Sequence, residues 1–233
     1  MSLPLFIARP VFSILFRLIR LTEGSKVAPL RRRKQLYETK SRTAFDTLLE
    51  KTLGEGSNTL IHYGLPYPKV DFLNYLCDHC DFVAHGSPLP DLPLLEPIRY
   101  SSDVTEFGNR KIIFSTPDAI WAMWFAILDK GRARSTSNAC IRLGSRASQW
   151  DKYYHFNLPV NMQGQYPFTE GTIYLAHASD FPEKHAMRQL EFFGAEFEEW
   201  GSAKPVQPVA RLQISPQDFP YLGSVEYNMP VRA

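Results

Sequence analysis

Short apolar runs that are separated by turn residues dominate the chain from residue 82 onward and predict a set of β-strands. Runs of this kind lie at residues 82–84, 111–114, 140–143, 153–158, 171–177 and 206–214. The third and fourth runs are expected to pair with each other. The pattern therefore predicts a core that is rich in strands.

Three stretches have apolar residues at helical spacing instead, at residues 41–53, 70–79 and 119–128. The third of these is apolar on every face, so we expect it to be a buried helix. Thr116 and Pro117 come just before it and have the residue types typical of an N-cap and of the first helical position.

The first 37 residues differ in composition from the rest of the chain. The apolar stretch from Leu3 to Leu21 contains no run long enough to span a bilayer, because it is interrupted by Arg9, Pro10, Arg17 and Arg20. Three interpretations stay open: a mitochondrial presequence, a peripheral helix that packs on the domain, and an interfacial helix on a membrane surface. We expect a basic amphipathic segment at 1–37, a single domain at 38–222 and an irregular tail at 223–233.

The composition is that of an ordinary globular protein, and a net charge of +2 gives no argument for nucleic-acid binding. Three cysteines cannot form a fully paired disulfide framework, and no Asn-x-Ser/Thr sequon occurs. These features predict an intracellular protein of the cytoplasm, with the mitochondrion as the alternative that the Arg-rich start allows. Cys77 and Cys80 have the spacing of a metal-binding pair, but no second pair follows, so we expect no bound zinc.

Two of the expected strands end in polar residues. The first leads into His85-Gly86-Ser87 and the second into Ser115-Thr116. A glycine lets a ligand approach the backbone closely. Polar groups at strand ends beside a buried apolar helix are typical of a small-molecule site, which we expect here.

This order of elements resembles the ADP-ribosyltransferase superfamily over about residues 80 to 215. The superfamily includes the poly(ADP-ribose) polymerases and the tRNA 2′-phosphotransferases. The resemblance implies an α+β fold with a split, mostly antiparallel β-sheet core and N-terminal helices. It also implies an NAD-dependent ADP-ribosyltransferase or NAD glycohydrolase that cleaves the nicotinamide–ribose bond, with NAD as the substrate and a protein or nucleic acid as the acceptor.

The resemblance assigns roles to the first motif residue by residue. His85 would hydrogen-bond a ribose hydroxyl and take part in catalysis. Gly86 would offer its backbone N–H and C=O to the nicotinamide amide, and Ser87 would support that edge.

The second motif would complete the NAD site. Phe114 would stack on the nicotinamide, with Trp121 of the buried helix as the alternative, and Ser115 and Thr116 lie where the second-strand motif of the family lies. The sequence departs from the polymerases at Ile113, where they carry an aromatic residue, and this leaves the stacking partner open.

Cleavage of NAD passes through an oxocarbenium-like state, which a carboxylate stabilises. Glu199 is the favoured candidate because it lies in the acidic stretch just before the last strong strand, and Glu198 and Glu170 are alternatives. Alternation along a strand would put Glu196 and Glu198 on the opposite face from Glu199, so these three cannot all serve one cleft.

Other classes of function stay open. If no glutamate serves, the tRNA 2′-phosphotransferases, which bind phosphate and NAD through histidine and arginine, become the better comparison; the available arginines are Arg99, Arg110, Arg132 and Arg134. A catalytically inactive nucleotide-binding or protein-interaction domain on the same scaffold is the alternative to an enzyme. A mitochondrial or membrane-surface structural protein governed by residues 1–37 is a further class. The oligomeric state is left open.

Overall fold

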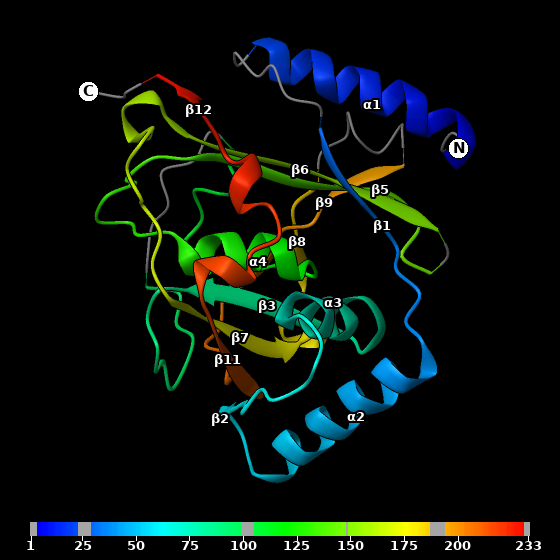
Figure 1. The fold of residues 1–233 in the computed structure, drawn as a ribbon, viewed down its shortest axis with the longest axis vertical. Coiled ribbons are helices and arrows are strands. Elements are labelled where there is room, and N and C mark those ends of the chain that lie inside the picture. Colours follow the sequence, from blue (N-terminus) through cyan, green and yellow to red (C-terminus); the bar gives the residue numbers. More distant parts are fainter. Residues whose placement is uncertain (1–3, 23–28, 99–104, 148, 187–193, 231–233) are drawn as a thin grey trace.

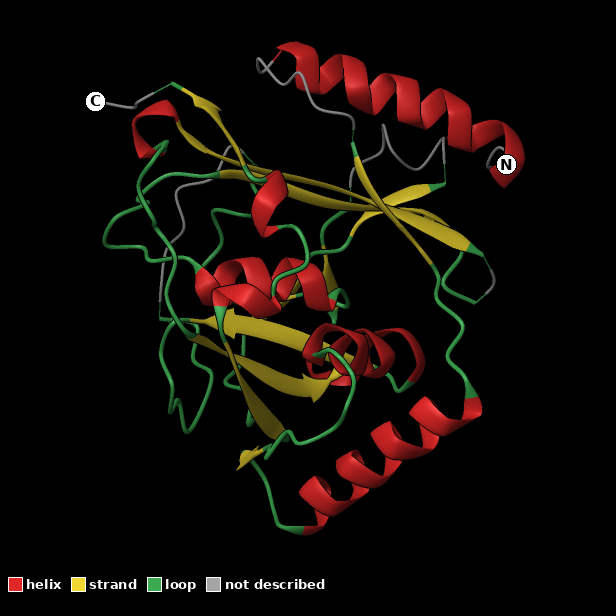
Figure 2. Cartoon of the chain, viewed as in Figure 1, coloured by secondary structure: helices red, strands yellow, loops and turns green. Residues whose placement is uncertain are grey.

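The computed structural model of the chain describes residues 4–22, 29–98, 105–147, 149–186 and 194–230. Its α-helices are α1 (Leu5–Thr22), α2 (Thr39–Gly54), α3 (Lys69–His79) and α4 (Ala119–Ile127). Short 3-10 helices lie at Val160–Met162, Ala178–Asp180, Pro216–Asp218 and Leu222–Ser224. The helices pack around and between sheets whose strand pairs are mostly antiparallel (Figure 1, Figure 2). The expected α+β class with N-terminal helices is confirmed.

The first sheet is built around β6 (Trp150–Pro159). One edge of β6 pairs with β5 (Ser137–Gly144), and β9 (Ala195–Phe197) continues the sheet beyond β5. The other edge takes two strands in succession, β1 (Leu30–Arg33) and β12 (Glu226–Met229). The strand pair expected from the sequence is confirmed, with Cys140 opposite Tyr154.

The second sheet has the order β2 (Thr59–Leu60), β11 (Ala210–Ile214), β7 (Gly171–His177) and β3 (Phe82–Ser87). A bridge from Ala84 to Thr116 joins its β3 edge to a smaller sheet. This smaller sheet has the order β4 (Ile113–Ser115), β10 (Trp200–Ser202) and β8 (Glu183–Lys184). The strand order β3–β4–β10 decides which of the predicted motifs lie side by side.

The helix α4 lies between the two large sheets (Figure 1), and eight of its nine residues are buried, as its sequence predicts. On the side of the first sheet, the Trp124 ring lies 5.0 Å from that of Phe156, between centroids. The start of the helix differs from expectation. Asp118 rather than Thr116 is the N-cap, because Asp118 Oδ1 accepts the N–H of Trp121 at 2.8 Å.

On the side of the second sheet, α4 rests directly on two strands. A Cβ on Gly86 of β3 would lie 1.9 Å from the carbonyl oxygen of Ala122, and one on Gly171 of β7 would lie 2.0 Å from that of Ala126. No other residue type fits at these positions without a shift of the backbone, because the contact is with the helix backbone itself. Glycines on neighbouring strands and alanines four residues apart on the helix therefore make this close approach.

The expected boundary at residue 37 does not separate a peripheral segment from the domain. β1 forms part of an edge of the first sheet, and α1 packs on the outer face of that sheet, where Phe12 and Phe16 contact Tyr153. Arg20 is buried and paired with Glu226. Since Glu226 belongs to β12, the expected irregular tail from residue 223 also contains a strand of the sheet. In the described ranges, no helix is both long and apolar enough to cross a bilayer.

Candidate functional site

The ends of the two strands that carry the predicted motifs are adjacent. The N–H of Ala84 donates to the carbonyl of Thr116 at 2.8 Å, and the N–H of Thr116 donates to the carbonyl of Ala84 at 3.0 Å. Among the described residues, the ladder between β3 and β4 is confined to this bridge. One residue further along β3, His85 Nδ1 lies 2.7 Å from the carbonyl oxygen of Phe114. Beyond Ala84 the contact between the two strands is thus made by the His85 side chain instead of a backbone ladder, and we call this place the β3–β4 split.

Gly86 is the next residue of β3 whose backbone faces the split. Backbone groups two residues apart in a strand point to the same edge, so the N–H and C=O of Gly86 point to the edge where Ala84 meets Thr116. The Cα of Gly86, in contrast, is covered by the carbonyl of Ala122. The missing side chain of Gly86 therefore allows α4 to approach the face of the sheet, and only the strand edge of this residue is directed toward the split.

The hydroxyl groups that the resemblance assigns to NAD binding each have a backbone partner. Ser115 Oγ donates to the carbonyl of Ala84 at 3.0 Å, and Ser87 Oγ accepts the N–H of Leu89 at 3.2 Å. Thr116 Oγ1 accepts a backbone N–H from the turn before α4 at 3.0 Å. Ser87, Ser115 and Thr116 are all buried. In this structure they fix the ends of β3 and β4.

The two aromatic residues considered for stacking differ in accessibility. Trp121 is buried, and its Nε1 donates to Asn138 Oδ1 at 2.7 Å, so its ring is held in the core. Phe114 is partly exposed and meets Phe107 edge-on, with 6.0 Å between the ring centroids. Of these two rings, Phe114 is the one that a planar ligand can reach.

Glu199 immediately precedes β10, the strand next to β4. Its Oε2 lies 2.9 Å from Nδ1 of His185, the residue that follows β8. The His185 ring is stacked between two phenylalanines, with centroid distances of 5.0 Å to Phe107 and 4.9 Å to Phe197. A histidine that is itself fixed between aromatic rings therefore orients the carboxylate, whose side chain keeps partial access to solvent.

The register places the two predicted catalytic residues on opposite faces of the sheet. Extending the pairing of β4 and β10 by one residue puts Glu199 in the row of Thr116 and Ala84. His85 belongs to the neighbouring row, and neighbouring rows point to opposite faces. On its own face the His85 ring approaches Tyr174. His85 and Glu199 thus both flank the split, but by this register they do not face each other across one cleft.

Glu198 is part of a buried group of ion pairs. Its carboxylate contacts Lys152 at 3.0 Å, Arg142 at 3.0 Å and also Arg146. Burial opposes the charged form of Glu198, but Lys152, Arg146 and Arg142 outweigh burial and lower the pKa of its carboxyl. A carboxylate held ionised by three cations in this way is a structural group and is poorly suited to exchange a proton during catalysis.

Lys152 of β6 is the centre of these ion pairs. Its Nζ also contacts Asp118 at 3.0 Å, Asp78 at 3.6 Å and the carbonyl of Pro117 at 3.0 Å. Arg32 of β1 contacts the same two aspartates, at 3.1 Å and 2.6 Å respectively. Burial alone would raise the pKa of Asp118, but Lys152 and Arg32 hold it well below its ordinary value. We call this set the inter-sheet ion network: Arg32, Asp78, Asp118, Arg142, Arg146, Lys152, Glu196 and Glu198.

Glu170, the remaining candidate, is exposed and immediately precedes β7. β7 pairs with the edge of β3 that is opposite to the split, with Thr172 facing Ser87. Glu170 therefore starts from the wrong side of β3 to complete a site in the split.

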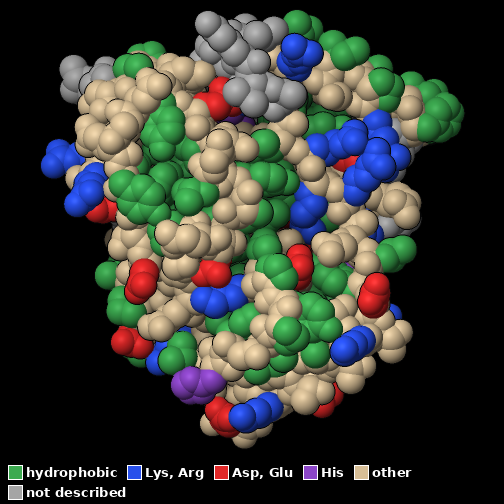
Figure 3. All heavy atoms as spheres, viewed as in Figure 1, with side chains coloured by type: hydrophobic (Ala, Val, Ile, Leu, Met, Phe, Trp, Pro, Cys, Tyr) green, Lys and Arg blue, Asp and Glu red, His purple; other side chains and the backbone are tan. Residues whose placement is uncertain are grey.

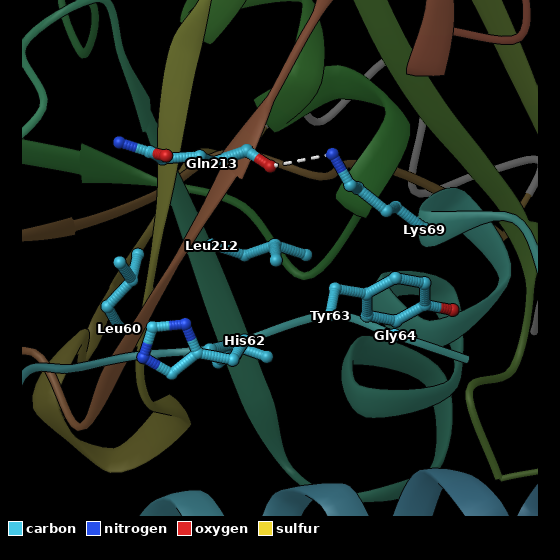
Figure 4. Close-up of a pocket in the computed structure, with 8 residues that line it drawn as sticks. Leu60, His62, Tyr63, Gly64, Lys69, Leu212 and Gln213 are labelled. Atoms are coloured by element: carbon cyan, nitrogen blue, oxygen red, sulfur yellow. Dashed lines mark hydrogen bonds between the residues drawn. The ribbon is translucent and has the colours of Figure 1, made fainter.

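A shallow cavity of about 450 Å³ lies at the far edge of the second sheet, between β11 and the segment that follows β2 (Figure 4). Lys69 is its cationic residue, but its Nζ donates to the carbonyl of Gln213 and to Asp218, both at 3.1 Å. His62 lies at its rim and is exposed. None of the residues predicted from the sequence lines this cavity.

Neither a metal site nor a phosphate-binding site is evident among the described residues that could form one. Over the described ranges, no three His, Cys, Asp or Glu side chains come together as a metal site would need. Of the arginines considered for phosphate binding, Arg110 pairs with Glu183, Arg132 pairs with Asp129, and Arg99 lies outside the described residues.

No family model, no curated protein and no solved structure matches the chain.

Proposed function

We propose that the chain binds NAD in the β3–β4 split and cleaves its nicotinamide–ribose bond, as an ADP-ribosyltransferase or NAD glycohydrolase. One observation carries the proposal. The strand with His85-Gly86, the strand with Phe114 and the strand preceded by Glu199 lie side by side in the order β3–β4–β10. These segments are far apart in the sequence, and they are the ones on which the resemblance to the ADP-ribosyltransferase superfamily rests.

Each group has a chemical role in this proposal. The strand edge of Gly86 offers one N–H and one C=O, which match the C=O and NH₂ of the nicotinamide amide. Phe114 stacks on the nicotinamide ring. Glu199, held by His185, stabilises the positive charge that develops on the ribose as the bond breaks. A ligand bound between β3 and β4 is accessible from both faces of the sheet. It can therefore contact His85 on one face and Glu199 on the other.

The test is the release of nicotinamide from NAD by the purified chain, measured by chromatography. Glu199→Gln keeps the shape of the side chain and removes its charge, so we expect the rate to fall by about two to three orders of magnitude with little change in melting temperature. The matched control is Glu170→Gln, which we expect to retain the wild-type rate. We expect His85→Ala to raise the NAD concentration that gives half the maximal rate.

Two results would contradict this reading. A fully active Glu199→Gln variant would remove Glu199 from the mechanism while leaving the NAD site in place. A wild-type chain that releases no nicotinamide under any condition in which NAD binds would remove the enzymatic activity altogether.

An inactive NAD-binding domain is the second candidate, and it is favoured by the placement of His85 and Glu199 on opposite faces of the sheet. For such a domain, NAD raises the melting temperature but no nicotinamide is released. A ligand at 100 times its dissociation constant adds about 2.7 kcal/mol to the free energy of unfolding, which a thermal melt resolves easily. If NAD leaves the melting temperature unchanged at millimolar concentration, both candidates are wrong.

A further inference from the structure

The outward face of α1 is apolar. Ile7, Val11, Ile14 and Leu18 are all exposed, and Ile14 and Leu18 keep 62% and 54% of their surface accessible. At 100° per residue these four positions fall within an arc of about 60°, so they form one continuous stripe along the helix. Phe6 extends the apolar surface at the start of the helix and is 75% exposed.

A different face of α1 fixes the helix to the first sheet. Ala8, Phe12 and Phe16 are buried in a cluster with Tyr153. Near the end of the helix, the buried Arg20 pairs with Glu226 and donates from Nε to His155 Nδ1 at 3.2 Å. At 100° per residue these buried positions are centred about 130° from the exposed stripe, so the apolar surface of the helix extends beyond the part that the described residues of the domain cover.

The charges around the exposed stripe are basic. α1 contains no acidic residue, and Arg17 on it is exposed. Arg31 of β1 is opposite Tyr153 and Arg33 is opposite Asp151. Residues opposite each other in a sheet share a face, so these two exposed arginines lie on the same outer face that α1 covers. In Figure 3 basic side chains gather below α1 and beside β1, next to hydrophobic side chains at the upper edge of the molecule.

We propose that α1 and the neighbouring arginines form a docking surface for an anionic lipid bilayer. A helix with an apolar stripe and flanking arginines lies in the plane of the bilayer interface, where the stripe enters the acyl region and the arginines meet the head groups. The stripe is aliphatic throughout and carries no group that forms directional hydrogen bonds. Protein interfaces, in contrast, are enriched in aromatic residues and contain regular hydrogen bonds, so a bilayer suits this surface better than a protein partner does.

The test is flotation of the full chain with vesicles of phosphatidylcholine, with or without phosphatidylserine. We expect binding to the phosphatidylserine vesicles that weakens as salt is raised, because the arginine contribution is screened. The double variant Ile14→Glu/Leu18→Glu should bind at least about tenfold more weakly, since it puts charge into the acyl region. Arg31→Gln/Arg33→Gln should bind several-fold more weakly. Val160→Glu, a charge at an exposed apolar position on another surface, is the matched control and should bind like wild type.

Several outcomes would overturn the proposal. They are no binding of the wild type to either vesicle, equal binding to both vesicles, or an equal loss in the Val160→Glu control. Light scattering completes the test. A wild-type dimer that the double glutamate variant abolishes, in the absence of vesicle binding, would show that a second copy of the chain covers the stripe. The result does not depend on the NAD proposal, because none of these variants lies near the β3–β4 split.

Discussion

Replacing Lys152 by methionine should destabilise the protein strongly, because it removes the central cation of the inter-sheet ion network while roughly preserving side-chain volume. Only 1% of the Lys152 side chain is accessible, so water cannot take the place of the ammonium group. Asp118 and Glu198 each lose a partner at 3.0 Å. Removal of one member of a buried ion pair typically costs about 3–5 kcal/mol. Since Arg32 still contacts Asp118, we expect the lower end of that range, about 3 kcal/mol.

Urea unfolding measures this loss. The matched control is Arg110→Ala, which breaks a partly exposed pair with Glu183, and such pairs contribute at most about 1 kcal/mol. In a chain of this size each 1 kcal/mol corresponds to a change of about 2–4 °C in melting temperature, so Lys152→Met should melt about 6–12 °C lower. A loss no larger than that of the Arg110→Ala control would refute the idea that Lys152 holds the network together.

The pH dependence provides an independent check of the same reasoning. The pKa values of Asp118 and Glu198 are lowered in the folded protein, so on acidification the unfolded chain binds protons first. Their contribution to stability is therefore complete above the unfolded pKa of about 4 and is lost as the pH falls below it. Lys152→Met removes a cause of both lowered pKa values. The difference in free energy of unfolding between wild type and variant should therefore narrow below about pH 4. A gap that stays constant in this range would contradict the argument.

Two further predictions follow from burial. Burial and the neighbouring Arg20 lower the pKa of His155 to about 4. Its Nδ1 accepts a hydrogen bond from Arg20, so the contact of 3.8 Å from Glu226 to the same nitrogen is not an ion pair. Between about pH 6.5 and 4 the unfolded chain binds more protons than the folded protein, so the free energy of unfolding should fall by about 3 kcal/mol on acidification. His155→Gln should flatten the plot of this free energy against pH over the same range. An unchanged slope in the variant would implicate another group. Gly86→Ala should lower the free energy of unfolding by about 1–3 kcal/mol, because the added Cβ meets the α4 backbone. Gly64→Ala, where the added Cβ has nothing within 4 Å, should lower it far less. Equal losses of the two variants in urea unfolding would contradict the importance of this contact.

The parts of the fold that the sequence predicts are those that local patterns determine. The nine residues of α4 are apolar on all faces, which requires burial wherever the helix lies, and the short apolar runs around it contain the expected strands. The N-cap is a harder case. Thr116 and Asp118 both have suitable side chains two residues apart, and the choice between them depends on the bridge from Thr116 to Ala84, which is a long-range contact.

The ion network is not predictable from local patterns. Lys152 lies between aromatic residues in a strand, and nothing near it in the sequence indicates that its partners are Asp78, Asp118 and Glu198. A lysine beside an apolar run is a weak signal of a buried pair. The same limit explains why the sequence sets residues 1–37 apart from the domain. Their arginines are typical of an exposed segment, but Arg32 finds its carboxylates only when β1 joins the sheet.

The candidate site and the inter-sheet ion network share one short turn, so a change in the network should alter the position of the site. The turn begins at Thr116, which makes the last bridge to β3, and ends at Asp118, which caps α4. Lys152 binds both the carbonyl of Pro117 and the carboxylate of Asp118 from the first sheet. The β3–β4 split is therefore held from the opposite sheet. If the β3–β4 split binds NAD, Lys152→Met should weaken that binding in addition to lowering stability, although Lys152 lies on a different sheet from the residues proposed to bind the nucleotide.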